Sequence, residues 1–169
     1  MTITVAQLDT MPETEAAFKL AACCGSSRWV AEMVRRRPFH TCEDVTRVAD
    51  EISDTLSGDD WLEAFAHHPK IGEGKARASV APAAAEWSAG EQAGVGRVSG
   101  AVRDTLTAAN LEYERTFGFI FIISANGRSA DDILSALLAR LGNTTEEEMA
   151  IAAQEQRKIT RLRLEKLLA

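Results

Sequence analysis

Apolar residues recur at helical spacing along most of the chain. In residues 43–56 the apolar positions Val45, Val48 and Ile52 follow one another three or four residues apart, and residues 98–117 repeat the pattern. This spacing places apolar side chains on one face of a helix, which can then pack against a core. The chain is therefore predicted to consist mainly of amphipathic helices.

Capping residues predict where several of these helices begin. Hydroxyl-bearing side chains stand just before apolar stripes, often with an acidic residue three positions later, as in a capping box. We expect helices to begin at Thr10, Ser27, Thr41, Ser129 and Thr144 or Thr145. Residues 59–68 should form a further helix, which Pro69 ends because proline disfavours helical backbone in the residue before it. Together these signals predict an all-α fold of about eight helices.

One segment does not follow the helical pattern. Residues 118–125, GFIFIISA, form a dense run of β-branched and aromatic residues. Alone the run resembles a buried strand, but the chain offers no second strand to pair with it, and a single strand leaves its backbone groups without partners. We therefore expect either a buried extended connector or a continuation of the preceding helix.

Polar residues suited to catalysis gather between residues 61 and 95. His67 and His68 stand directly before Pro69, and an irregular charged loop follows, leading to a helix that we expect to open at Ser88. Ser88 and Glu91 also fit a simple capping box, and a histidine in a last helical turn suits the helix dipole, so both features have purely structural interpretations. The spacing of these residues alone therefore predicts no more than a helical domain, in which a polar pocket is one possible interpretation of this segment.

Arg163 differs from the other basic residues near the C-terminus. It lies on the same side of the last predicted helix as Ile159, Ala152 and Gln156. We therefore expect Arg163 to point inward, whereas its basic neighbours are most simply a solvated helix face.

Composition excludes several classes of protein. A length of 169 residues fits one domain, residues 1–169, and the net charge of −6 argues against a nucleic-acid partner. No apolar run is long enough to span a membrane. No export signal is evident, and the chain has three cysteines, so we expect free thiols in the reducing cytoplasm. A metal site is not expected, since the cysteines and histidines lack the usual ligand spacings: Cys23, Cys24, His40, Cys42, His67 and His68.

Five segments in a fixed order resemble one enzyme family. They are AHHPKIGEGKA, EWSAGEQAGV, NLEYERTFGFIFIISANGRS, ILSALLARLGN and EQRKITRLRLEKL, with weaker agreement in SRWVAEMVRRRPF. Together they cover most of the chain and resemble the 2-oxo-4-hydroxy-4-carboxy-5-ureidoimidazoline (OHCU) decarboxylases, which form (S)-allantoin in urate breakdown. Any one segment alone would be a weak signal, whereas their combination is specific.

The resemblance implies a role for individual residues. The histidine directly before the proline is catalytic in the family, which selects His68 over His67, and Glu91 would orient its ring and favour its charged form. The resemblance assigns the substrate-binding residues as follows: Pro69, Ser88, Gln92, Phe121, Ile122, Ile123, Ser124, Ala125 and Arg163. It also implies a homodimer and a reaction that needs neither a cofactor nor a metal. A non-catalytic helical interaction domain is the alternative, and a metal-dependent hydrolase is a third option.

Overall fold

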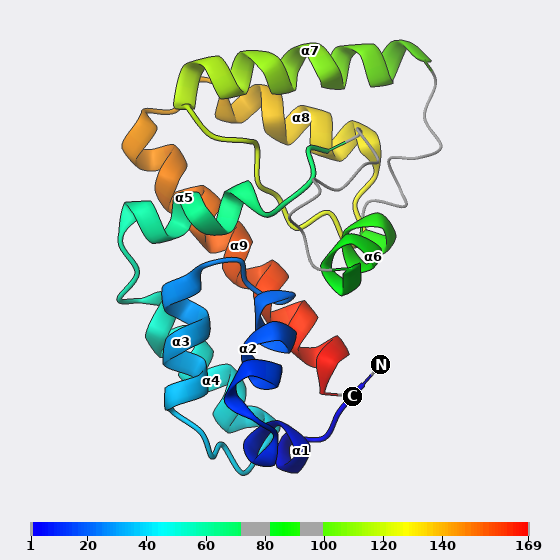
Figure 1. The fold of residues 1–169 in the computed structure, drawn as a ribbon. Coiled ribbons are helices and arrows are strands. Elements are labelled where there is room, and N and C mark those ends of the chain that lie inside the picture. The colour runs from blue at the N-terminus through cyan, green and yellow to red at the C-terminus, as the bar shows by residue number, and fades with distance from the viewer. Residues whose placement is uncertain (1, 72–81, 92–99, 169) are drawn as a thin grey trace. The chain divides into compact units, whose positions relative to one another are not determined.

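The computed structural model describes residues 2–71, 82–91 and 100–168 (Figure 1). Within these ranges the chain is helical or irregular and contains no strand, so the predicted all-α class is confirmed. The helices are α1 (Val5–Thr10), α2 (Glu13–Ala21), α3 (Ser27–Arg35), α4 (Cys42–Ser53), α5 (Gly58–Ala66), α6 (Pro82–Glu91), α7 (Gly100–Phe117), α8 (Ala130–Arg140) and α9 (Thr145–Leu167). None of these helices is long and apolar enough to cross a membrane.

The helices belong to two compact units. The first unit comprises Met1–Ala64 and Arg157–Ala169, and the second comprises Phe65–Gln156. Helices α5 and α9 contribute residues to both units. The candidate chemistry around His68 falls in the second unit.

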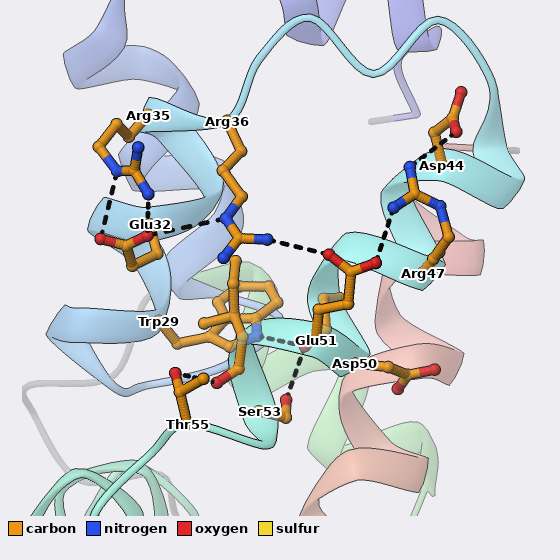
Figure 2. Close-up of polar contacts among 12 residues, drawn as sticks. Trp29, Glu32, Arg35, Arg36, Asp44, Arg47, Asp50, Glu51, Ser53 and Thr55 are labelled. Carbon is orange, nitrogen blue, oxygen red and sulfur yellow. Dashed lines mark hydrogen bonds and ion pairs between the residues drawn. The ribbon is translucent and has the colours of Figure 1, made fainter.

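The first unit is built on α2, α3 and α4. Helix α3 packs against both α2 and α4, and Trp29 of α3 is fully buried. The indole Nε1 of Trp29 donates to the carbonyl of Ala49 in α4 at 3.3 Å, so its polar atom is satisfied inside the core. Figure 2 shows a second link on the surface, where Arg36 donates to Glu51 at 3.0 Å. Exposed ion pairs of this kind contribute little to stability, so we attribute the packing of α3 against α4 mainly to buried side chains such as Trp29.

Several predicted helix starts are confirmed, and others are shifted. Thr41 and Ser129 cap α4 and α8 as expected, each accepting a backbone N–H three residues later. The predicted start at Thr10 is wrong, because Thr10 ends α1 and Pro12 precedes α2. Helix α1 was not predicted, although Thr4 and Gln7 form a capping box that signals it. Helix α3 begins at the predicted Ser27, with Ser26 as its cap.

In the second unit, α7 and α8 pack side by side and are joined by the segment from residue 118 to 129 (Figure 1). Helix α7 ends at Phe117, and Gly118 follows with a φ of +79°, the left-handed conformation in which glycine commonly ends helices. The buried face of α7 carries Leu106, Asn110, Tyr113 and Phe117, all from the predicted stripe. Residues 118–125 are not helical and are mostly buried, so a buried connector is confirmed and the helix continuation is wrong.

Side chains form hydrogen bonds with backbone groups of this connector that a partner strand would bind in a sheet. Arg140 of α8 donates through Nη1 to the carbonyl of Ile122 at 2.9 Å, and its guanidinium lies 4.5 Å from the ring centre of Phe121. On α9, Glu155 accepts the backbone N–H of Ser124 at 2.8 Å. Charged groups supplied by two helices therefore satisfy backbone groups that a sheet would otherwise have to pair.

A buried polar cluster fixes Arg140 in turn. Glu148 of α9 is fully buried and accepts hydrogen bonds from the guanidinium of Arg140, from the hydroxyl of Tyr113 and from the amide of Asn143. Burial and the bond to Glu148 raise the pKa of Tyr113 well above its ordinary range, so its hydroxyl remains a neutral donor. Arg140 is thus paired on one side and free to donate to the connector on the other.

Candidate active site

The first candidate residue, His68, lies just beyond the end of α5. The prediction of a helix through residue 68 is wrong by two positions, since α5 ends at Ala66. The backbone N–H of His68 bonds to the carbonyl of Phe65 at 3.0 Å, a tighter turn than the α-helix makes. His67 also lies outside the helix, in a turn, so both histidines follow the end of α5. Pro69 explains this early end, because it disfavours helical backbone at His68.

The two adjacent histidines have different surroundings. The side chain of His68 is buried, with 8% of its surface exposed, whereas His67 is half-buried. Ring atom Nε2 of His68 lies 2.7 Å from the side-chain oxygen Oε1 of Gln156, a fully buried residue of α9. The ring that the resemblance selects is therefore held inside the second unit.

Gln156 is a residue for which the sequence predicted a position but no role. The helical spacing of α9 places it on the inward side, which its full burial confirms. Its partner His68 lies 88 positions earlier in the chain, so no local pattern could have paired the two. The signal that was available is a glutamine on the inward face of a helix, which requires a buried hydrogen-bond partner.

The connector lies next to the same part of α9. Glu155, which holds the backbone of Ser124, directly precedes Gln156, which holds His68. Ser124 is half-buried. The other predicted contact residues of the connector are buried, namely Phe121, Ile122, Ile123 and Ala125. Two consecutive residues of one helix thus fix both the ring and the main chain of the connector.

The loop that leaves His68 is anchored to α7. Pro69 is half-buried, and the ammonium group of Lys70 pairs with Glu114 at 2.7 Å. The amide of Asn110, itself buried, donates to the carbonyl of Ile71 at 3.2 Å and to that of Leu106 at 2.9 Å. These contacts restrain the chain on the far side of Pro69.

The structure corrects the prediction for Ser88 and Glu91. Helix α6 runs from Pro82 to Glu91, so Ser88 lies inside its last two turns and does not cap a new helix. The predicted helix start at Ser88 is therefore wrong, and the role of Ser88 in binding substrate stays a prediction. Ser88 itself is buried, with 3% exposed, and Glu91 is half-buried. Gln92 lies outside the described residues.

Arg163 belongs to the first unit. It is buried, as its spacing predicted, and its Nη1 donates to the carbonyl of Ala22 at 3.2 Å. Its role in holding substrate stays a prediction.

The cysteines offer little to a metal or to a thiolate mechanism. Cys23 and Cys24 are buried and Cys42 is exposed, all as free thiols. Burial raises the pKa of Cys24 to about 11, so its sulfur stays protonated at neutral pH, whereas metals and nucleophilic reactions require the thiolate. In the part of the chain that the structure describes, no three His, Cys, Asp or Glu residues form a group that could hold a metal ion.

Known proteins resemble this chain in sequence and in fold. The uric acid degradation bifunctional protein TTL of Arabidopsis thaliana is 38% identical over 148 residues, which cover 87% of this chain and 45% of that protein. The uric acid degradation bifunctional protein PucL of Bacillus subtilis is 31% identical over 161 residues, covering 94% of this chain and 31% of that protein. The chain thus spans less than half the length of either relative.

A solved structure agrees along most of its length. A crystal structure of OHCU decarboxylase in the presence of (S)-allantoin has 36% sequence identity and a TM-score of 0.76, covering 89% of this chain and 97% of the other. The family model for OHCU decarboxylase matches residues 9–165. Because that match takes in nearly the whole sequence, the chain belongs to the OHCU decarboxylase family.

Proposed function

We propose that this protein is a carboxy-lyase that converts OHCU to (S)-allantoin without a cofactor, in urate degradation. The observation that carries the proposal is the buried ring of His68, held at 2.7 Å by Gln156 beside the connector that Glu155 fixes. A buried, hydrogen-bonded histidine next to ordered main chain is suited to moving one proton in a defined direction. Family membership supports the substrate class.

The chemistry of the substrate explains why such a small set of groups suffices. Its carboxylate is attached to a carbon beside a ring imine. When the carbon–carbon bond breaks, carbon dioxide leaves and the electron pair enters the imine, so the substrate supplies its own electron sink. A prosthetic group would add little, and the protein's tasks are orientation and proton transfer to one face of the planar intermediate.

His68 and Glu91 would divide the proton chemistry. The unperturbed pKa of histidine lies near neutral pH, so His68 can give up a proton and regain it within one turnover. Glu91 would favour the charged form of the ring through its carboxylate. Ser88, Gln92 and the main chain of residues 121–125 would bind the carbonyl and ureido oxygens, with the buried connector side chains excluding water.

The burial of two candidate residues weighs against the alternative, a non-catalytic interaction domain. That alternative expects the polar residues 68, 88, 91 and 92 to be exposed, since nothing would require their burial. His68 and Ser88 are instead 8% and 3% exposed. Burying polar groups is unfavourable unless they are hydrogen-bonded, so the burial of His68 and Ser88 favours a catalytic site over an interaction surface.

Product chirality provides the direct test. Freshly made OHCU decays slowly to racemic allantoin, and circular dichroism separates this background from an enzymatic product. We expect an excess of (S)-allantoin that scales with protein concentration and survives exhaustive chelation. An unchanged racemic product would remove the decarboxylase function, and loss of activity on chelation would instead favour a metal-dependent hydrolase.

Glu91 gives a graded prediction within this function. We expect Glu91→Gln to lower kcat by roughly tenfold, less than the loss on removing the ring, because the carboxylate acts through the charge of His68. The double variant His68→Asn/Glu91→Gln should be little worse than His68→Asn alone, since groups that act as a unit are not additive. Glu86→Gln, an exposed residue of the same helix, is the matched control. Additive losses in steady-state kinetics would contradict the coupling.

We also propose a cytoplasmic homodimer. The compartment is supported by the three free thiols, which an oxidising environment would not favour. The dimer rests on family resemblance, and light scattering at micromolar concentration tests it. A monomer mass across the concentration range would refute it.

A further inference from the structure

The contact between His68 and Gln156 defines which ring nitrogen carries a proton. In the structure, Nε2 of His68 faces the side-chain oxygen of Gln156 at 2.7 Å. An amide oxygen only accepts hydrogen bonds, so a hydrogen bond between these two atoms requires a proton on Nε2. In the neutral ring the lone pair then lies on the other nitrogen, Nδ1.

We propose that Gln156 is a positioning residue that keeps His68 in the Nε2–H tautomer, so that proton exchange with the substrate takes place at Nδ1. The inference rests on the proposed function only for the identity of the reaction. The tautomer itself is a property of the resting protein and can be observed without substrate.

Burial makes this contact stronger than a surface hydrogen bond. Gln156 is fully buried and His68 is 8% exposed, so water competes poorly for either atom. If the oxygen of Gln156 were removed, this contact could no longer favour a proton on Nε2, and leaving a buried N–H without an acceptor is unfavourable. Gln156 therefore contributes to the free-energy difference between the two neutral tautomers of His68.

The neighbouring residue extends the effect to the connector. Glu155 holds the backbone N–H of Ser124 at 2.8 Å, one position before Gln156. Helix α9 therefore holds both the ring of His68 and the backbone of the connector at Ser124 through two consecutive residues. The same contact also holds the orientation of the imidazole ring, because the ring cannot flip without breaking the hydrogen bond to Gln156.

Nitrogen-15 NMR of the ring tests the proposal, because protonated and unprotonated imidazole nitrogens have well-separated chemical shifts. The signals of His68 are identified by their loss in His68→Asn, and spectra are recorded at a pH where titration shows the ring to be neutral. We expect the Nε2–H tautomer in the wild-type protein. Gln156→Leu, which removes the acceptor at similar size, should raise the Nδ1–H population, whereas Gln156→Glu, which retains an acceptor, should preserve Nε2–H.

The matched control is Gln154→Leu, the same substitution at an exposed position of α9. It should leave the His68 signals and the activity unchanged. In kinetics, Gln156→Leu should lower kcat by about tenfold or more with a smaller change in KM, because a wrong tautomer impairs proton transfer and leaves substrate contacts in place. Gln156→Glu should recover part of that loss.

The possible outcomes separate this proposal from the proposed function. Nδ1–H in the wild-type protein, or a tautomer that does not respond to Gln156→Leu in folded protein, overturns the positioning role whatever the activity. If Gln156→Leu fails to fold, Gln156→Glu and the wild-type spectrum still decide the question. An Nε2–H ring in a protein that yields only racemic allantoin would sustain the role of Gln156 and remove the decarboxylase function.

Discussion

Replacing His68 by asparagine should lower kcat by roughly a hundredfold or more, with the protein still folded. This is the usual contribution of a positioned acid–base group, and asparagine retains polarity without a titratable nitrogen. His67→Asn should keep most of the activity, because His67 is half-buried in a turn outside α5. The pair is a matched comparison, since the same substitution is made at adjacent positions before Pro69.

The measurement is kcat for both variants, in protein whose helix content and unfolding midpoint match the wild type. His68 makes a buried contact with Gln156, so a moderate loss of stability is expected at that position and must be separated from the loss of rate. Equal losses of kcat, or a larger loss at His67, would show that the catalytic role belongs to the other ring or is shared.

The largest expected effect on stability is at Glu148. Glu148→Gln keeps the shape of the side chain but removes the charge that compensates Arg140, and it replaces one accepting oxygen by an NH2 donor among donors that already point inward. Breaking one partner of a buried ion pair typically destabilises a protein by about 3–5 kcal/mol. Urea unfolding of the variant should show a free energy of unfolding that is lower by that amount, observed as a lower midpoint.

Two further variants make the Glu148 prediction specific. Glu146→Gln removes a charge from an exposed position in the same first turn of α9 and should change the unfolding free energy by about 1 kcal/mol or less through the helix dipole. The double variant Arg140→Met/Glu148→Leu removes both charges and should recover part of the loss, but not all, because the carbonyl of Ile122 and the side chains of Tyr113 and Asn143 each lose a partner. Similar midpoints for Glu146→Gln and Glu148→Gln would show that the buried pair does not stabilise the fold.

The helices were largely predictable because their signals are local. Apolar stripes and caps such as Thr41 and Ser129 act within one or two turns, and the structure confirms them. Ser88 shows where local reasoning fails. A serine three residues before a glutamate also occurs inside helices, and the stronger signal was Pro82, since proline is favoured in the first turn.

The candidate site was less predictable because its contacts are distant in sequence. The sequence left residues 118–125 between an extended connector and a helix, since the groups that satisfy that backbone, Arg140 and Glu155, lie beyond the segment. The buried face of α9 was foreseen, but its pairing with His68 was not. Family resemblance selected His68 over His67, which composition could not do.

The connector has a consequence for solubility. Residues 119–123, FIFII, combine high β-propensity with no charge and no proline, which is the composition of segments that form intermolecular β-structure. In the folded chain Arg140 and Glu155 occupy backbone groups that another copy of the segment would otherwise pair with. The same two side chains that order the connector therefore also protect it, and local opening of α8 or α9 would expose a template for aggregation.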